Sequence, residues 1–220
     1  CRAYGLPLIS GKDSMKNDYM GGGVKISIPP TVLFSVVGVI PDVNLAMTSD
    51  FKQPGDVLYL LGLTRKELGG SEYADELGLT YTAVPEVEAV PARERYLSLY
   101  AAMQQQLVTA CHDLSDGGLG VTLAEMAIGG RLGAELDLSA VPALGDMSPA
   151  ELLYSESSSR FLVSVSPAKQ AAFEALFAGQ CLAKVGRVTA GDQVEVRAAD
   201  APILSESVES LALAWQATLD

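Results

Sequence analysis

Hydrophobic and polar residues alternate with two different periods along the chain, and the change of period predicts alternating strands and helices. Short apolar runs rich in Val, Ile and Leu predict strands at 57–63, 108–116, 133–139, 160–166, 181–189 and 193–198. Apolar residues at helical spacing predict helices at 92–107, after Gly118, near 149–157, at 167–179 and at 209–219. This order of elements is typical of an α/β or α+β domain.

The first part of the chain is organised differently. One strand is predicted at 4–10, and two more are predicted within 24–40, because the Pro29-Pro30 pair must interrupt any continuous ladder there. A linker with several turn residues follows, which places a domain boundary near residues 42–54. We therefore predict two domains, residues 1–45 and residues 46–220.

Composition indicates a folded, soluble protein. Of the 220 residues, 49% are hydrophobic and 19% are charged, which is enough apolar material for a sizeable core. The net charge of −12 disfavours nucleic acid, and no apolar stretch approaches the roughly 18–20 residues of a membrane span, so neither is expected as a partner. Three cysteines without a CxxC pair favour a reducing compartment, and we expect the cytoplasm. Without an initiator methionine or a signal-peptide pattern, the chain is expected to be part of a longer protein.

Residues 109–130 carry the most informative polar pattern. Asp113, Ser115 and Asp116 stand directly before Gly117-Gly118 and an amphipathic helix. Glycines allow positive φ and a close approach of the backbone to a ligand, and a helix N-terminus attracts an anionic oxygen. Carboxylates are the ligands that Mg²⁺ prefers, and the serine adds a hydroxyl. The pattern is typical of a site for a metal-bound phosphate.

The polar residues also have purely structural interpretations. Ser and Asp are preferred N-cap residues, so the turn could hold only a capped helix. His112, the single histidine of the sequence, is expected to be a packed or hydrogen-bonded neighbour rather than a zinc ligand. Gly69-Gly70-Ser71 fits either a phosphate nest or the junction of two capped helices. Glu125 is expected to face solvent or an interface rather than to be catalytic, and Arg160 to pair with Glu156 rather than with a phosphate.

Four segments, in this order, resemble one enzyme family. LPLISGKDSMKND, LGGSEY, HDLSDGGLGVTLAEMAIGG and SESSSRFLVSV are similar to the second half of the synthetase region in the phosphoribosylformylglycinamidine synthase family, and the resemblance covers nearly the whole chain. It implies that residues 1–45 end a second N-terminal domain like that of aminoimidazole ribonucleotide synthetase. Residues 46–220 would form the matching C-terminal domain, with helices packed on a mixed sheet. The first copy of this domain pair and a glutaminase domain or subunit would be its partners.

The resemblance also implies a reaction and a set of site residues. The family converts formylglycinamide ribonucleotide, ATP and glutamine-derived ammonia to formylglycinamidine ribonucleotide through an iminophosphate, and Mg²⁺ neutralises the triphosphate. Asp113 matches a Mg²⁺ ligand and Ser115 a nucleotide contact, while Gly11 and Ser14 match a loop that touches ATP and substrate. Lys12 stands where smaller members carry a metal-binding Asn. Because an ammonium cannot bind a metal ion, Lys12 is expected to meet a nucleotide phosphate. Positioning and electrostatics, rather than a nucleophilic side chain of the protein, would drive this transfer.

Two functional hypotheses follow. In the first, Gly11 and Ser14 help to close a catalytic ATP site formed with the first copy. In the second, the segment around Asp113 holds a nucleotide and Mg²⁺ that staple the fold without turnover. Membership of another ATP-dependent enzyme of the aminoimidazole ribonucleotide synthetase superfamily is a third interpretation. The chain alone is expected to be inactive, and a homodimer through a face that normally meets the first copy stays open.

Overall fold

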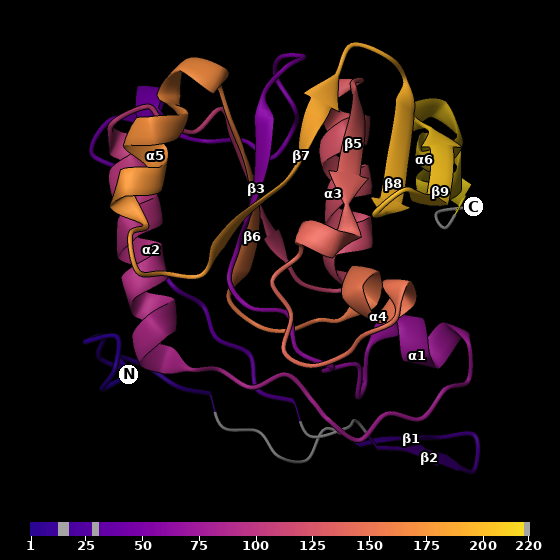
Figure 1. Ribbon diagram of the computed structural model, residues 1–220. Helices are drawn as coiled ribbons and strands as arrows, with labels where there is room; N and C mark the ends of the chain where they lie inside the picture. Colours follow the sequence, from indigo (N-terminus) through magenta and orange to yellow (C-terminus); the bar gives the residue numbers. More distant parts are fainter. Residues whose placement is uncertain (13–17, 28–30, 218–220) are drawn as a thin grey trace.

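The computed structural model describes residues 1–12, 18–27 and 31–217, and a seven-stranded sheet lies at its centre (Figure 1). The strands are β3 (Val57–Leu61), β4 (Ala110–Leu114), β5 (Gly133–Asp137), β6 (Arg160–Val165), β7 (Leu182–Thr189), β8 (Gln193–Ala198) and β9 (Ala201–Ser207). Their spatial order is β4-β6-β3-β7-β5-β8-β9. All neighbours are antiparallel except β5 and β8, which are parallel. The expected mixed sheet is therefore confirmed.

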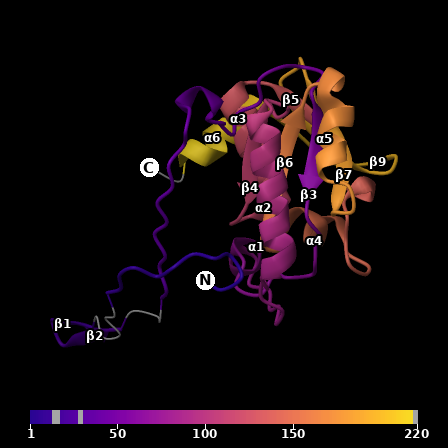
Figure 2. The same cartoon turned by 90° about the vertical axis from the view of Figure 1, so that its left-hand side faces the viewer.

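Helices cover both faces of this sheet. They are α1 (Glu72–Glu76), α2 (Ala89–Gln104), α3 (Gly118–Gly130), α4 (Pro149–Tyr154), α5 (Gln170–Leu176) and α6 (Val208–Ala217), with short 3₁₀ turns η1 (Val43–Leu45), η2 (Leu138–Ala140) and η3 (Pro167–Lys169). α2 and α5 lie side by side on one face, and α3 and α6 lie on the other (Figures 1 and 2). None of the helices in the described ranges combines the length and the hydropathy that a membrane-spanning helix needs.

Strand β3 shows why its sequence is an unbroken apolar run. Leu58 and Leu60 enter the core under α3, whereas Tyr59 and Leu61 enter the core under α2 and α5, and all four are at most 1% exposed. Successive side chains of a strand point to opposite faces, so a strand covered on both faces needs apolar residues at every position. The prediction of a buried strand here is confirmed.

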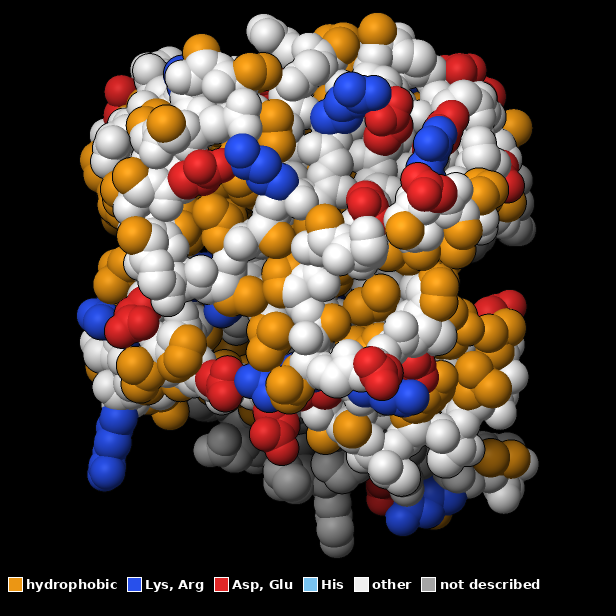
Figure 3. Space-filling model, in the orientation of Figure 1, with side chains coloured by type: hydrophobic (Ala, Val, Ile, Leu, Met, Phe, Trp, Pro, Cys, Tyr) orange, Lys and Arg blue, Asp and Glu red, His pale blue; other side chains and the backbone are white. Residues whose placement is uncertain are grey.

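The face that carries α2 and α5 is only partly covered. Over β5, β7 and β8 the described helices leave it open, and oppositely charged side chains pair there, once between β7 and β5 and once along β8 (Figure 3). Arg187 contacts Glu135 at 2.8 Å, and Arg197 contacts Glu195 at 2.8 Å. Water screens exposed pairs of this kind, so they add little to stability. They keep this half of the face polar.

Residues 1–45, called the arm below, hold one hairpin. β1 (Tyr19–Gly21) and β2 (Val24–Ile26) pair antiparallel around Gly22-Gly23, whose φ angles of 58° and 77° favour glycine. Figure 2 shows the hairpin projecting away from the rest of the molecule. The predicted strand at 4–10 and the second predicted strand of 24–40 are wrong, because residues 4–10 and 31–40 adopt no strand. A strand needs ladder hydrogen bonds from a neighbour, which an apolar pattern alone does not supply.

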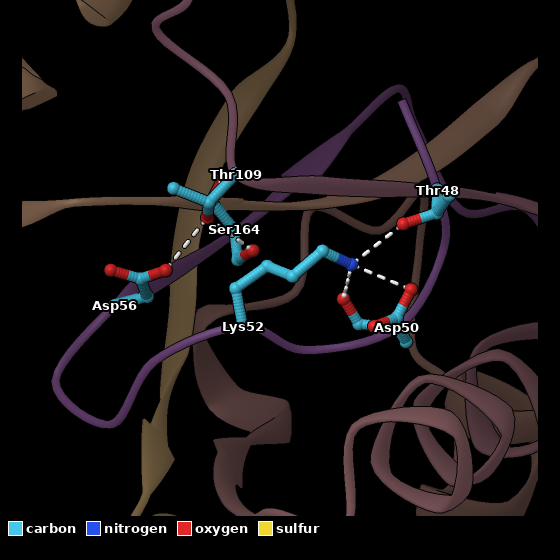
Figure 4. Close-up of polar contacts among 6 residues, drawn as sticks. All are labelled: Thr48, Asp50, Lys52, Asp56, Thr109 and Ser164. Atoms are coloured by element: carbon cyan, nitrogen blue, oxygen red, sulfur yellow. Dashed lines mark hydrogen bonds and ion pairs between the residues drawn. The ribbon is translucent and has the colours of Figure 1, made fainter. Parts of the chain in front are cut away.

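The segment 46–56 joins the arm to residues 57–217, and residues 46–217 together are called the body. The Lys52 ammonium donates to the Thr48 hydroxyl at 2.6 Å and to the Asp50 carbonyl oxygen at 2.7 Å (Figure 4). Asp56, 2% exposed, accepts a hydrogen bond of 2.7 Å from the Thr109 hydroxyl, which also lies 2.7 Å from the Ser164 hydroxyl. Asp56, the last residue of the predicted linker, thus ties the segment 46–56 to residues 57–217. The division into two domains at residue 45 stays a prediction.

Two parts of the body differ from the predictions. β9 is not among the predicted strands. It contains Pro202, which is tolerated at the edge of the sheet, where β8 is the one neighbour of β9. The helix-like residues on both sides of Gly69-Gly70 form only the five-residue α1. The other body elements lie within a few residues of their predicted ranges.

Candidate functional site

The turn between β4 and α3 carries the polar residues that the sequence singles out. β4 ends at Leu114, and α3 begins at Gly118. Gly117 and Gly118 have φ angles of 75° and 60°, in the left-handed region that favours glycine. The predicted start of the helix and the predicted positive φ of both glycines are confirmed.

The N-terminus of α3 is bound by the protein itself. The Glu156 Oε1 atom accepts hydrogen bonds from the backbone N–H of Gly117 at 2.9 Å and of Glu72 at 3.2 Å. A Cβ at Gly118 would lie 2.3 Å from the Ser155 carbonyl oxygen, so this glycine admits the loop before β6 rather than a ligand. The anion attracted to this helix N-terminus is therefore a carboxylate of the chain.

The N-cap position of α3 bears on the capped-helix interpretation of the turn. Gly117 is the N-cap residue of α3, and neither Ser115 nor Asp116 occupies that position. The interpretation of Ser115 or Asp116 as a helix cap is therefore wrong. Both side chains are exposed, as is that of Asp113, whose side chain is 63% accessible to solvent.

Asp113, Ser115 and Asp116 line one cavity of about 810 Å³. Its remaining lining residues are Tyr4, Phe34, Pro85, Val87, Tyr96, Leu114, Glu156, Ser158, Ser159, Arg160 and Phe161. The lining combines carboxylates and serine hydroxyls with aromatic rings from the arm, from α2 and from β6. A cavity of this size and composition accommodates a ligand with a planar apolar part and a polar or charged part.

The register of β4 and β6 explains which residues meet in the cavity. Asp113 pairs with Phe161 across the two strands, and both side chains lie on the face that carries α2. His112 points to the opposite face, where its Nε2 atom lies 2.9 Å from the Glu125 Oε2 atom. Its Nδ1 atom lies 2.8 Å from the Asp113 carbonyl oxygen. The expectation that His112 is a hydrogen-bonded neighbour of the turn is confirmed.

Glu125 faces solvent in part and has a partner that the sequence does not predict. Its side chain is 37% accessible to solvent, as expected, but it also contacts His112 across the space between α3 and β4. Because one ring nitrogen of His112 faces a carbonyl oxygen and the other faces a carboxylate, both nitrogens meet acceptors. This pair braces the backbone of Asp113 from behind the cavity.

Arg160 is a structural residue, although it bonds different partners from those expected. It is 1% exposed, and its guanidinium donates to the carbonyl oxygens of Ser155 and Ser157 and to the Thr64 hydroxyl. The predicted pairing with Glu156 is wrong, because the carboxylate binds backbone N–H groups instead. Burial lowers the pKa of Arg160 to about 10, so the guanidinium stays protonated at neutral pH. It holds the loop that covers the N-terminus of α3.

The other glycine pair has a structural role. Ser71 is the N-cap of α1, and its hydroxyl accepts a hydrogen bond from the Ala74 N–H at 3.2 Å. A Cβ at Gly69 would lie 2.7 Å from the Ala83 carbonyl oxygen, which receives a hydrogen bond from the Gly69 N–H. The helix-cap interpretation is confirmed for Ser71 as N-cap, but it is wrong for the glycines, because no helix ends at Gly69-Gly70.

The structure brings together only part of the predicted site. Asp113 and Ser115 share the cavity, whereas Gly11 and Lys12 lie exposed on the arm and do not line it. Ser14 lies outside the described residues. Tyr96 and Phe161 are lining residues that the sequence does not single out. Phe161 could have been found as the cross-strand neighbour of Asp113, but the periodicity of α2 places Tyr96 on a core stripe.

The carboxylates of the cavity bear on the Mg²⁺ expected from the sequence. Among the described residues, no group of three or more His, Cys, Asp or Glu side chains could hold a metal on its own. Mg²⁺ does not need such a cage, because it binds through one or two carboxylates and completes its shell with water and substrate phosphates. The Asp113 carboxylate, exposed in a cavity with Asp116 and Ser115, suits Mg²⁺ that arrives with a phosphate.

Comparison with known proteins defines the class of this chain. The family model described as "AIR synthase related protein, C-terminal domain" matches residues 53–199, and the chain belongs to this family. Among curated relatives, the phosphoribosylformylglycinamidine synthase subunit PurL of Thermococcus sibiricus is 38% identical over 187 residues, which are 85% of this chain and 25% of the relative. The subunit of the same name from Lacticaseibacillus casei is 35% identical over 219 residues, 99% of this chain and 28% of the relative. The chain thus spans about a quarter of their length.

Solved structures show the same fold. T. maritima PurL complexed with FGAR aligns with a TM-score of 0.68 at 23% identity, covering 77% of this chain and 30% of that chain. T. maritima PurL complexed with ATP aligns with a TM-score of 0.63 at 24% identity, covering 77% of this chain and 28% of that chain. These similarities confirm the expected C-terminal domain fold.

Proposed function

We propose that the chain is part of an ATP-dependent phosphoribosylformylglycinamidine synthase. The whole enzyme would convert formylglycinamide ribonucleotide, ATP and glutamine-derived ammonia to formylglycinamidine ribonucleotide in purine biosynthesis. The names of the relatives at 35% and 38% identity support this proposal, as does the match of residues 53–199 to the C-terminal domain of AIR synthase related proteins. Because the chain spans about a quarter of those relatives, the activity would belong to the longer protein, to which the chain would contribute residues that bind nucleotide.

That site is the cavity at the end of β4. We assign Asp113 as the ligand of a nucleotide-bound Mg²⁺ and Ser115 as a contact to the nucleotide. The single observation that carries this assignment is their common cavity of about 810 Å³, in which no helix cap occupies either side chain. The carboxylates of Asp113, Asp116 and Glu156 make the lining acidic. Bare phosphate would be repelled there, so a divalent cation must accompany it.

The arm carries the second set of proposed contacts. Gly11 and Lys12 would meet the nucleotide of the catalytic site, and Ser14 would meet the substrate. In the described residues, Gly11 and Lys12 do not line the cavity of Asp113. This separation favours two distinct sites, a catalytic one that includes the arm and an auxiliary one at Asp113. The auxiliary nucleotide would stabilise the fold without being turned over.

Calorimetric titration with Mg-ADP tests the site at Asp113. Asp113→Asn is expected to weaken binding at least about tenfold, because it removes a charge-bearing metal ligand while keeping the shape of the side chain. Asp146→Asn is the matched control, since Asp146 is also an exposed aspartate and does not line the cavity. Equal affinity of the wild type and Asp113→Asn would refute the assignment.

Kinetics of the full-length enzyme test the arm. Ser14→Ala is expected to raise the KM for the substrate or to lower kcat, since a contact made by the hydroxyl would be lost. Asp113→Asn in the same enzyme should leave kcat near the wild-type value if the site at Asp113 is auxiliary. A collapse of kcat in Asp113→Asn would instead make that site the catalytic one. Unchanged KM and kcat in Ser14→Ala would exclude Ser14 from substrate binding.

The remaining proposals concern partners and location. The first domain pair of the synthetase region and a glutaminase domain or subunit would complete the enzyme, and the cytoplasm would be its compartment. The word "subunit" in the names of the relatives supports an enzyme of several parts. Co-purification of tagged chain with the separately expressed first half would support the first of these partners. A homodimer of the chain would appear as a doubled mass in analytical ultracentrifugation.

A further inference from the structure

The cavity at Asp113 has an aromatic wall that the proposed contacts do not use. The ring of Tyr96, on α2, stacks on the ring of Tyr4 with 6.0 Å between centroids and 12° between planes. The Tyr96 ring also makes a T-shaped contact with the ring of Phe161, with 5.7 Å between centroids and 86° between planes. All three residues line the cavity. Tyr96 therefore presents one flat face to a planar partner while Phe161 holds the ring from the side.

The orientation of Tyr96 is fixed by the surrounding body. Its hydroxyl donates to the Ser159 hydroxyl at 2.7 Å. The preceding residue, Arg95, donates from Nη1 to the Ser159 carbonyl oxygen at 2.6 Å. Ser159 itself has a φ of 62°, a value that non-glycine residues rarely adopt, which indicates that its surroundings determine the conformation of this turn. Contacts within the body therefore fix the orientation of the Tyr96 ring, in addition to the stacked ring of Tyr4.

The wall lies close to the proposed phosphate end of the site. Phe161 is the direct cross-strand neighbour of Asp113, and their side chains share the face of the sheet that carries α2. Phe161 thus neighbours Asp113 across the two strands and the Tyr96 ring through its own ring. A nucleotide whose metal-bound phosphates meet Asp113 and Ser115 can extend its base in the direction of this ring.

We infer that Tyr96 is the stacking platform for the nucleobase of the nucleotide bound at Asp113, and that Tyr4 covers the face on which the base stacks. This inference rests on the proposed nucleotide site. Asp113 and Ser115 account for the metal-bound phosphates of the nucleotide, and Tyr96 would account for its base. An aromatic face recognises the π-surface of a base, and removing such a ring costs about 1–3 kcal/mol per base. The near-parallel contact of Tyr4 shows that this face accepts a planar ring.

Two probes that differ in the base test the inference on the full 220-residue chain. Tyr96→Ala is expected to lower the affinity for Mg-ADP by about 5- to 150-fold, which corresponds to the loss of one base–aromatic stack. The affinity for Mg-tripolyphosphate, which has no base, should stay within about twofold of the wild type. Tyr96→Phe keeps the ring and should keep most of the affinity for Mg-ADP.

Tyr100→Ala is the matched control, because Tyr100 lies one turn further along α2, is 51% exposed and does not line the cavity. Wild-type affinity for Mg-ADP in Tyr96→Ala would overturn the inference, as would an equal loss with both probes. If the wild-type chain binds neither probe, the proposed nucleotide site itself fails. Asp113→Asn separates the two ideas further, since it should weaken both probes.

A saturation-transfer NMR measurement provides a second, structural readout. The base protons of ADP should receive saturation from the wild-type protein and from Tyr100→Ala, because a stacked base lies against protein protons. In Tyr96→Ala, at a ligand concentration that restores occupancy, the signal of the base protons should fall relative to that of the ribose protons. An unchanged ratio would show that the base lies elsewhere and would overturn the inference.

Discussion

The arm and the body carry apolar residues of the same kinds but bury them to opposite extents. In the body, Leu58 and Leu162 are 0% exposed, whereas in the arm Val37 is 95% and Ile9 is 92% exposed. The β3 strand of the body has a hydrogen-bonded neighbour on each side, whereas residues 31–40 of the arm adopt no strand. The body therefore buries its apolar side chains and pairs its strands. The arm has a strand-like sequence, but within the described residues its 31–40 segment pairs with no strand and its apolar side chains stay exposed.

The two regions differ in the same way for polar groups. The buried Arg160 of the body donates to three oxygens from two separate loops. In the arm, the ion pair between Lys25 and Asp18 lies at the surface, where the Lys25 side chain is 56% exposed. Buried polar groups of the body need these hydrogen bonds for stability, because an unpaired buried group would lose its hydration without compensation. Exposure makes the arm contact replaceable by water.

Core truncation should separate the two regions most strongly. Leu162→Ala in the body is expected to lower the free energy of unfolding by about 2–5 kcal/mol, since it removes buried methyl groups and leaves a cavity. Val37→Ala in the arm should change it by less than about 0.5 kcal/mol. Urea unfolding followed by circular dichroism measures both. Similar losses in the two variants would mean that the arm buries Val37 in solution.

Thiol reactivity should distinguish the regions without any substitution in the core. Burial, aided by the negative charge of Asp113, raises the pKa of the Cys111 thiol to about 12, and burial also raises the pKa of Cys181. The thiolate is the reactive form, so at pH 8 only about one Cys111 in 10⁴ would be reactive. Exposed Cys1 in the arm should react first with Ellman's reagent.

Variants that retain one cysteine each would assign the phases of this reaction. The rate at Cys111 should rise as the pH approaches 12, because the thiolate fraction grows with pH up to the pKa. Labelling of Cys111 at pH 8 as fast as that of Cys1 would contradict the difference in burial between body and arm.

Helix caps offer a subtler comparison. In the body, Ser148 and Glu151 form a reciprocal capping box at α4, and Ser148→Ala is expected to cost about 1 kcal/mol. In the arm, Asp42 caps η1 through a hydrogen bond of 2.9 Å from the Asn44 N–H. Asp42→Ala should not change the unfolding free energy measurably, because no buried residue follows this cap. An equal cost at both caps would contradict the comparison.

The capping box also predicts a pH dependence. A hydrogen bond from Lys66 and the backbone N–H of Ser148 lower the pKa of Glu151. A lowered carboxyl pKa stabilises the folded state above the ordinary glutamate value of about 4.3, and this contribution is lost as the pH falls through the folded-state pKa. Glu151→Gln should therefore be less stable than the wild type at pH 7, and the difference should shrink at lower pH. A difference that is independent of pH would contradict this assignment.

Removal of the arm should have the smallest effect on the body. Residues 46–220 alone are expected to unfold with a free energy within about 0.5 kcal/mol of that of the whole chain, because the truncation removes few buried contacts. Solubility should rise, since exposed apolar surface is removed. Urea unfolding and light scattering measure the two effects. A large loss of stability would show that the arm is part of the same cooperative unit.

Much of the body follows from local sequence patterns. The apolar run of β3 and the helical stripe of α2 predict those elements because a strand and a helix repeat their side-chain directions every two and every 3.6 residues. Gly117-Gly118 predicts the start of α3 because positive φ favours glycine. Local patterns do not predict the edge strand β9. A strand tolerates Pro202 there only because β9 lies at the edge of the sheet.

The candidate site divides along the same line. The sequence by itself determined that Asp113 and Ser115 stand at a glycine turn before a helix, because all of these residues lie within one turn of chain. Only the tertiary structure decided that Glu156 binds the helix N-terminus, and that Tyr96 and Phe161 complete the cavity around Asp113. Strand register and helix packing bring these residues together over more than sixty positions of sequence. Local periodicity does not predict contacts between residues that are far apart in sequence. The packing of strands and helices in the folded domain determines those contacts.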